Sequence, residues 1–158
     1  MTDFSARILA WYDKHARVLP WRQPAGRGLP DSYAVWVSEI MLQQTRVETV
    51  IPYFERWLQQ FPTVQALAEA PEQRVLSAWE GLGYYSRARN LHKAARLIVS
   101  AYGGQLPAEP AELRKLPGVG RYTAAAIASI AFGLDVATLD GNLKRVFARV
   151  FDVSQPAD

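Results

Sequence analysis

The sequence predicts an all-α fold, and three observations lead to this prediction. Apolar residues recur at three-to-four spacing over most of the 158 residues, as they do on the buried face of a helix. Glycine and proline clusters separate these stretches, as is usual between helices. No segment alternates convincingly between apolar and polar residues; the best strand candidate, residues 136–139, is short and has no partner.

The predicted helices follow one another closely. Asp31 or Ser32 can cap the second, because their side-chain oxygens accept from first-turn N–H groups. Pro52 lies early in the third and removes one backbone donor there. In order, the helices cover residues 4–15, the stretch from Tyr33 to Met41 after a loop at 18–31, the stretch from Val47 to Leu58, and residues 63–69, 72–79, 85–102, 109–114, 121–132 and about 140–150.

We expect these helices to form two lobes. Residues 21–132 are expected to form a helical domain that carries a hairpin at about residues 112–126. Residues 1–20 and 133–158 are expected to form part of a second lobe. Because the chain stops soon after its last predicted helix, we expect the fold to be truncated at its C-terminal end.

Composition excludes several classes of site. A hydrophobic content of 49% with five tryptophans allows a sizeable core, and a net charge of +3 is compatible with nucleic acid binding. The chain has no cysteine, which excludes disulfides and an iron–sulfur cluster held by its own thiolates. It shows no signal peptide pattern and no apolar run of membrane-spanning length, so we expect a cytoplasmic protein without a membrane partner.

A glycine-rich hairpin precedes the predicted helix 121–132. Gly118 and Gly120 lack Cβ atoms and allow the backbone to approach a ligand. The N–H groups at the start of the following helix attract an anion, and Arg121 adds a mobile positive charge. The pattern fits a grip on one DNA phosphate; an ordinary glycine-containing helix–turn–helix is the alternative.

Two carboxylates are candidates for acid–base work. Glu39 lies in an apolar helix, where it faces either solvent or a cleft; burial would raise its pKa and make it a proton donor. Asp140 lies where a loop becomes a helix, which suits a simple N-cap or an ionised group at the mouth of a cleft. An acid and an anion together are the pair that breaks a glycosidic bond.

A third group of candidates lies in residues 81–90. Its glycines allow close approach, Tyr84 and Tyr85 can wedge between or stack on bases, and Arg87 can meet phosphate. The alternative is a helix start whose tyrosines pack into the core.

Together these motifs resemble the MutY-type adenine DNA glycosylases of the helix-hairpin-helix superfamily. The resemblance rests on the order and spacing of residues 19–21, 38–45, 50–54, 81–95, 116–124 and 139–142. It implies a helix-hairpin-helix glycosylase fold around a DNA cleft. It also implies double-stranded DNA as partner, with adenine mispaired with 8-oxoguanine or guanine as the flipped-out substrate.

The resemblance also implies roles for single residues. Glu39 would protonate the adenine and Asp140 would stabilise or capture the sugar, with Tyr122 and Asn142 assisting. The implied DNA-binding residues are Gln43, Gln44, Tyr84, Arg87, Gly118, Val119, Gly120, Arg121 and Lys144, of which Gln44 and Tyr84 would probe the strand opposite the adenine.

Tyr122 separates two subfamilies. Related endonuclease III-like lyases resemble this chain but carry a lysine at that position, and a phenol cannot form a Schiff base. We therefore expect a monofunctional glycosylase; a lyase-type enzyme and a non-catalytic DNA-binding fragment are the alternatives. Full-length relatives, expected to be monomers, would hold a [4Fe-4S] cluster whose cysteines are absent here, and hairpin carbonyls would bind a monovalent cation.

Overall fold

The computed structural model describes residues 2–22 and 28–153, and every regular element in these ranges is a helix. The helices are α1 (Thr2–His15), α2 (Ser32–Met41), α3 (Val47–Gln60), α4 (Val64–Glu69), α5 (Glu72–Ala78), α6 (Ser86–Tyr102), α7 (Pro110–Leu113), α8 (Arg121–Phe132) and α9 (Gly141–Val150). The all-α prediction is thus confirmed. Residues 23–27 of the predicted loop and 154–158 of the predicted second lobe lie outside the described residues.

Residues 136–139, the best strand candidate in the sequence, form no strand, in line with the lack of a partner segment. The segment runs between α8 and α9 without strand pairing, and its Val136 N–H donates to the Leu134 carbonyl instead. An isolated β-prone segment has no neighbouring backbone to complete a ladder, so propensity alone cannot make it a strand.

Local signals place the helix ends close to where the sequence predicts them. Asp31 caps α2, with Oδ1 accepting from the Ala34 N–H at 2.8 Å. α3 continues through Pro52, early in the helix. α6 ends at Gly103, whose φ of 61° is the left-handed conformation that glycine tolerates at a helix C-terminus.

The core lies among α2, α3, α5, α6 and α8, with α2 in contact with α3, α6 and α8. Three tryptophans, Trp36, Trp57 and Trp79, are fully buried in it. Trp57 packs edge-on against Trp79 and donates from Nε1 to the Tyr33 hydroxyl at 3.3 Å. The Tyr33 hydroxyl in turn donates to the Phe61 carbonyl at 2.8 Å, which ties α2 to the end of α3.

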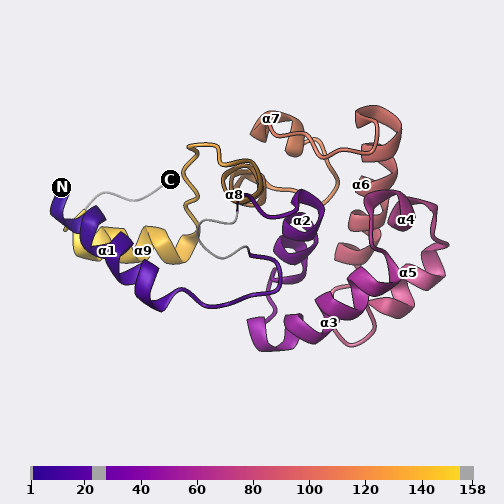
Figure 1. Cartoon of the computed structure of the whole chain (residues 1–158), viewed down its shortest axis with the longest axis horizontal. Helices are drawn as coiled ribbons and strands as arrows, with labels where there is room; N and C mark the ends of the chain where they lie inside the picture. Colours follow the sequence, from indigo (N-terminus) through magenta and orange to yellow (C-terminus); the bar gives the residue numbers. More distant parts are fainter. Residues whose placement is uncertain (1, 23–27, 154–158) are drawn as a thin grey trace.

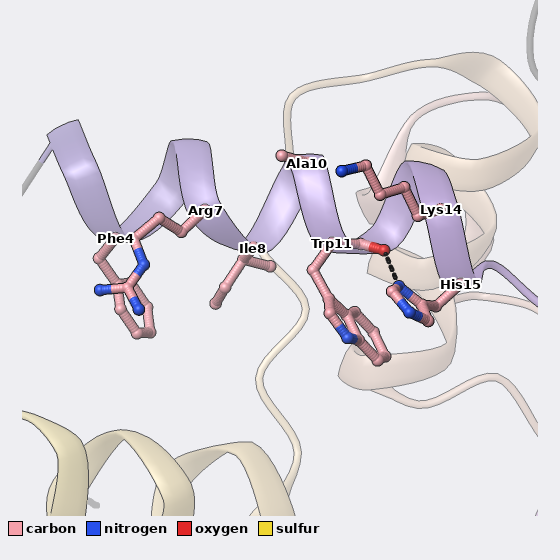
Figure 2. A pocket seen from close by; sticks show the side chains of 7 residues that line it. All are labelled: Phe4, Arg7, Ile8, Ala10, Trp11, Lys14 and His15. Carbon is pink, nitrogen blue, oxygen red and sulfur yellow. Dashed lines mark hydrogen bonds between the residues drawn. The ribbon is translucent and has the colours of Figure 1, made fainter.

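Helices α1 and α9 lie side by side at one end of the molecule, away from this core (Figure 1). The rings of Phe4 and Phe151 meet edge-to-face at 5.3 Å and join the two segments. Figure 2 shows Phe4, Ile8 and Trp11 on one side of α1, where they line an open groove of about 630 Å³. Among the described residues, no helix is long and apolar enough to span a bilayer.

Candidate active site

Four polar side chains from separate parts of the sequence are linked by their electrostatic effects around Tyr122, at the start of α8. They are Arg22 after the Trp21 turn, Glu39 on α2, Tyr122 in the first turn of α8, and Asp140 before α9. Burial raises the pKa of the Tyr122 phenol, and the negative charges of Glu39 and Asp140 raise it further, whereas Arg22 lowers it. These mutual effects place both predicted carboxylates within electrostatic range of one phenol.

Glu39 is partly buried on α2, so of the two environments expected for it the structure shows the shielded one. Desolvation raises the pKa of its carboxyl group, and the positive charge of Arg22 opposes that rise. A carboxyl group in this environment holds its proton at higher pH than a solvated one. Glu39 therefore has the property that a general acid requires.

Asp140 is the N-cap of α9, as the sequence suggests. Its Oδ1 accepts from the Leu143 N–H at 2.7 Å, and its Oδ2 accepts from Asn142 Nδ2 at 3.3 Å. Asn142 is itself engaged, because its Oδ1 accepts from Arg145. These bonds fix the orientation of the Asp140 carboxylate at a helix N-terminus, where negative charge is favoured.

The hairpin between α7 and α8 holds its two glycines in different backbone conformations. Gly118 has a φ of +81° and lies against Asn90, but Gly120 is extended, with φ −85° and ψ 178°, and a Cβ there would meet no atom within 4 Å. Val119 is buried and its N–H donates to the Leu116 carbonyl at 3.1 Å; the use of this N–H on phosphate stays a prediction.

The start of α8 nonetheless has the features of an anion site. Gly120 is its N-cap and provides no side-chain capping bond, and Arg121 is exposed beside it. The open space in front of Gly120 leaves the first-turn backbone accessible to a ligand.

Two turns near the site present Gln44 and Tyr84 to solvent. Gln44, in the turn after α2, is exposed with a φ of 57°, and Tyr84, before α6, is 64% exposed with a φ of 49°. Tyr85 is 39% exposed, so the alternative that both tyrosines pack into the core is excluded. Gln43 is partly buried and donates from Nε2 to Thr123 Oγ1 at 3.3 Å, which links its turn to α8.

Arg87 does not take the place expected of a phosphate contact. It is 8% exposed, and its guanidinium donates to backbone carbonyls that include those of Met41, at 2.9 Å, and Leu82, at 3.0 Å. Charge alone predicts a surface role; the glycine turn at 81–83 and the end of α2 enclose the side chain instead.

Arg22 is the site residue that sequence reasoning missed. Its charge acts on Glu39 and on Tyr122, and its Nη1 donates to the Tyr12 hydroxyl at 2.9 Å. The only signal was its place directly after Trp21, which is 4% exposed and anchors that turn in the core.

Comparison with known proteins identifies the family. Residues 37–158 match the model of the HhH-GPD superfamily base excision DNA repair proteins. The chain belongs to the HhH-GPD superfamily. This span includes both carboxylates, the hairpin and the turns that carry Gln44 and Tyr84, but not Arg22.

Similar curated proteins of this superfamily are adenine DNA glycosylases, which confirms the resemblance found in the sequence. The chain is 51% identical to that of Homo sapiens over 154 residues, which are 95% of the chain and 28% of the human protein. It is 43% identical to that of Buchnera aphidicola subsp. Baizongia pistaciae over 152 residues, which are 96% of the chain and 42% of that protein. The chain thus spans less than half the length of these relatives.

Solved HhH-GPD-like structures confirm the fold. A thermostable thymine-DNA glycosylase superposes with a TM-score of 0.82 at 29% identity, covering 92% of this chain and 65% of that one. Endonuclease III in a trapped covalent intermediate with DNA superposes with a TM-score of 0.81 at 23% identity, covering 99% of this chain and 71% of that one.

The part of the chain that the structure describes shows no cluster of side chains typical of a metal centre. It has no cysteine with which to hold an iron–sulfur cluster. The described residues contain no group of three or more histidine, aspartate or glutamate side chains placed to hold a metal ion.

Proposed function

We propose that the chain is the catalytic module of an adenine DNA glycosylase that acts on adenine opposite 8-oxoguanine or guanine. The observation that carries the proposal is that Glu39 and Asp140 both act electrostatically on Tyr122, while burial raises the pKa of Glu39 and Asp140 caps α9. The names of the relatives support adenine as the base.

In the proposed reaction, Glu39 gives its proton to N7 of the flipped-out adenine. The C1′–N9 bond then breaks, and its electron pair leaves with the base. The Asp140 carboxylate stabilises the positive charge at C1′ or captures it. Water finally supplies the hydroxyl group at C1′, and the proton it loses restores the acid–base pair.

DNA would be held by the backbone and by exposed side chains around this site. The open α8 N-terminus at Gly120, with Arg121 beside it, would hold one phosphate. Tyr84 would enter the base stack, and Gln44 would contact the opposite strand. Lys144, on the first turn of α9, would approach the backbone near the reacting sugar, and a monovalent cation at the hairpin carbonyls stays a prediction.

The reaction would stop at base release, because Tyr122 supplies no amine where a lyase needs one. The test is a product analysis with a labelled duplex that carries adenine opposite 8-oxoguanine. We expect an abasic product that breaks only after alkali, and no protein–DNA adduct with borohydride. Stoichiometric borohydride trapping would instead establish a lyase, and tight binding without base loss would establish a non-catalytic DNA-binding module.

A further inference from the structure

One buried guanidinium joins the two turns that present Gln44 and Tyr84. Arg87 Nη1 donates to the carbonyl of Gln43 at 2.6 Å, and Nη2 donates to Thr45 Oγ1 at 3.2 Å. These acceptors are the residues on either side of Gln44. Nη2 also donates to the carbonyl of Gly83 at 3.2 Å, directly before Tyr84.

Both presented residues have an unusual backbone conformation. Within residues 2–22 and 28–153, the non-glycine residues with positive φ are Gln44, Tyr84 and Asp152. A left-handed glutamine or tyrosine is strained, and such a conformation persists only where its surroundings fix it. Arg87 thus binds the immediate neighbours of two of these three residues, Gln44 and Tyr84.

The guanidinium is also held between aromatic rings. Its Cζ lies 5.2 Å from the centre of the Trp79 ring and 5.6 Å from that of Tyr84. Trp79 is fully buried, and its Nε1 donates to the same Gly83 carbonyl at 3.0 Å. The rigid core therefore fixes Arg87, and Arg87 fixes the turns.

We propose that Arg87 is a positioning residue that sets Gln44 and Tyr84 in one geometry for reading the base opposite the adenine. This proposal rests on the proposed function. A lysine at this position keeps the charge, but its three N–H donors radiate from one nitrogen, so it cannot reproduce the planar fork that serves six acceptors in Arg87. Arg87 would therefore control discrimination between 8-oxoguanine and guanine more than the cleavage chemistry itself.

The test compares Arg87→Lys with the parent chain in single-turnover adenine release opposite 8-oxoguanine and opposite guanine. We expect the preference for 8-oxoguanine to fall about tenfold, while release opposite guanine changes little. Arg96→Lys is the matched control, since Arg96 is on the same helix and bonds only the Ala68 carbonyl of α4 among the described residues. An unchanged preference, an equal loss on both duplexes, or a variant unfolded at the assay temperature would overturn the proposal.

A double-mutant cycle separates positioning from general stability. If Arg87 acts through Tyr84, then Arg87→Lys should alter the preference far less in a Tyr84→Ala background. Equal effects in both backgrounds would contradict the proposal.

A binding readout keeps the two proposals distinguishable. 2-Aminopurine beside 8-oxoguanine brightens when an inserted side chain unstacks it, and this signal does not need base release. A parent chain that raises this fluorescence but releases no adenine would refute the proposed function alone. In that case, a lower 2-aminopurine fluorescence with Arg87→Lys would still support Arg87 as a positioning residue, and an unchanged fluorescence would refute it.

Discussion

At the scale of single residues, Glu39 combines a proposed catalytic role with a cost to the stability of the fold. Because its pKa is raised above the ordinary value of 4.5, the folded chain binds the proton more tightly than the unfolded chain. The stabilisation by this proton is present at low pH. It is lost as the pH rises from about 4.5 through the raised pKa, so at neutral pH the ionised group opposes folding.

This predicts that Glu39→Gln stabilises the chain at neutral pH. The glutamine amide has no charge to desolvate. The thermal midpoint of the variant should therefore exceed that of the parent at pH 7, and the difference should shrink toward pH 4. Thermal melts followed by circular dichroism at both pH values measure it. A parent that is the more stable chain at pH 7 would show that burial does not disfavour the Glu39 carboxylate.

The sequence marks Glu39 and Asp140 as candidates because of their local contexts, an apolar helix for one and a loop-to-helix boundary for the other. Each context leaves two roles open, and only the family resemblance implies the catalytic one. The sequence could not predict the roles of Arg87 and Arg22. Burial of Arg87 depends on how α6 packs against the end of α2, and the position of Arg22 depends on a turn more than a hundred residues from Asp140. Neither arrangement leaves a periodic signal in the sequence.

At the scale of elements, the N-terminus of α9 has a structural and a proposed chemical role that two substitutions separate. Asparagine caps a helix about as well as aspartate, whereas alanine does not. We expect Asp140→Asn to lose adenine release while retaining stability, and Asp140→Ala to lose about 1 kcal/mol of stability as well. Urea unfolding and base release on both variants check this; an active Asp140→Asn would show that its charge is not needed.

Two glycine substitutions in the hairpin between α7 and α8 form a second matched pair of variants. Gly118→Ala puts a Cβ at 3.0 Å from Asn90 Cβ on a φ of +81°, so we expect a loss of about 1–2 kcal/mol in unfolding free energy. Gly120→Ser adds a good N-cap in open space, so stability should be kept.

The serine oxygen would, however, compete with phosphate for the first-turn N–H groups of α8. We therefore expect Gly120→Ser to bind duplex DNA about tenfold more weakly at fixed salt. Fluorescence anisotropy with a labelled duplex measures this. Equal affinity of parent and variant would remove the α8 N-terminus from the DNA-binding surface.

The sequence predicts elements well here because glycine, proline and capping residues stand at their ends. The 121–132 helix, for instance, begins and ends as expected, between Gly120 and Gly133. The strand candidate at 136–139 forms no strand because strand formation depends on a partner strand, whose absence is already evident in the sequence. The sequence could not show that the two hairpin glycines, Gly118 and Gly120, have different backbone conformations, because their sequence contexts are similar.

At the scale of the whole molecule, α1 and α9 form an apolar end that the rest of the described chain leaves open. Exposed side chains on it include Leu9 at 62%, Trp11 at 59% and Val146 at 52%. The Phe4–Phe151 contact joins α1 to the residue that follows α9. Such an aromatic pair contributes about 0.5–1.5 kcal/mol to stability.

We expect Phe151→Ala to loosen α1 without unfolding the core, because the buried tryptophans lie among other helices. Limited proteolysis should cleave α1 faster, while the main thermal transition should stay unchanged. A large drop of that transition would mean that this end is part of the cooperative core.

The central claim is that Glu39 donates the proton that releases adenine, and Glu39→Gln tests it most directly. The measurement is single-turnover adenine release from a duplex with adenine opposite 8-oxoguanine, with binding to the same duplex measured in parallel. We predict that release falls by about 10²–10⁴-fold while affinity changes little, since glutamine keeps the shape but has no acidic proton. A Glu39→Gln chain that binds and releases adenine at the parental rate would contradict the account.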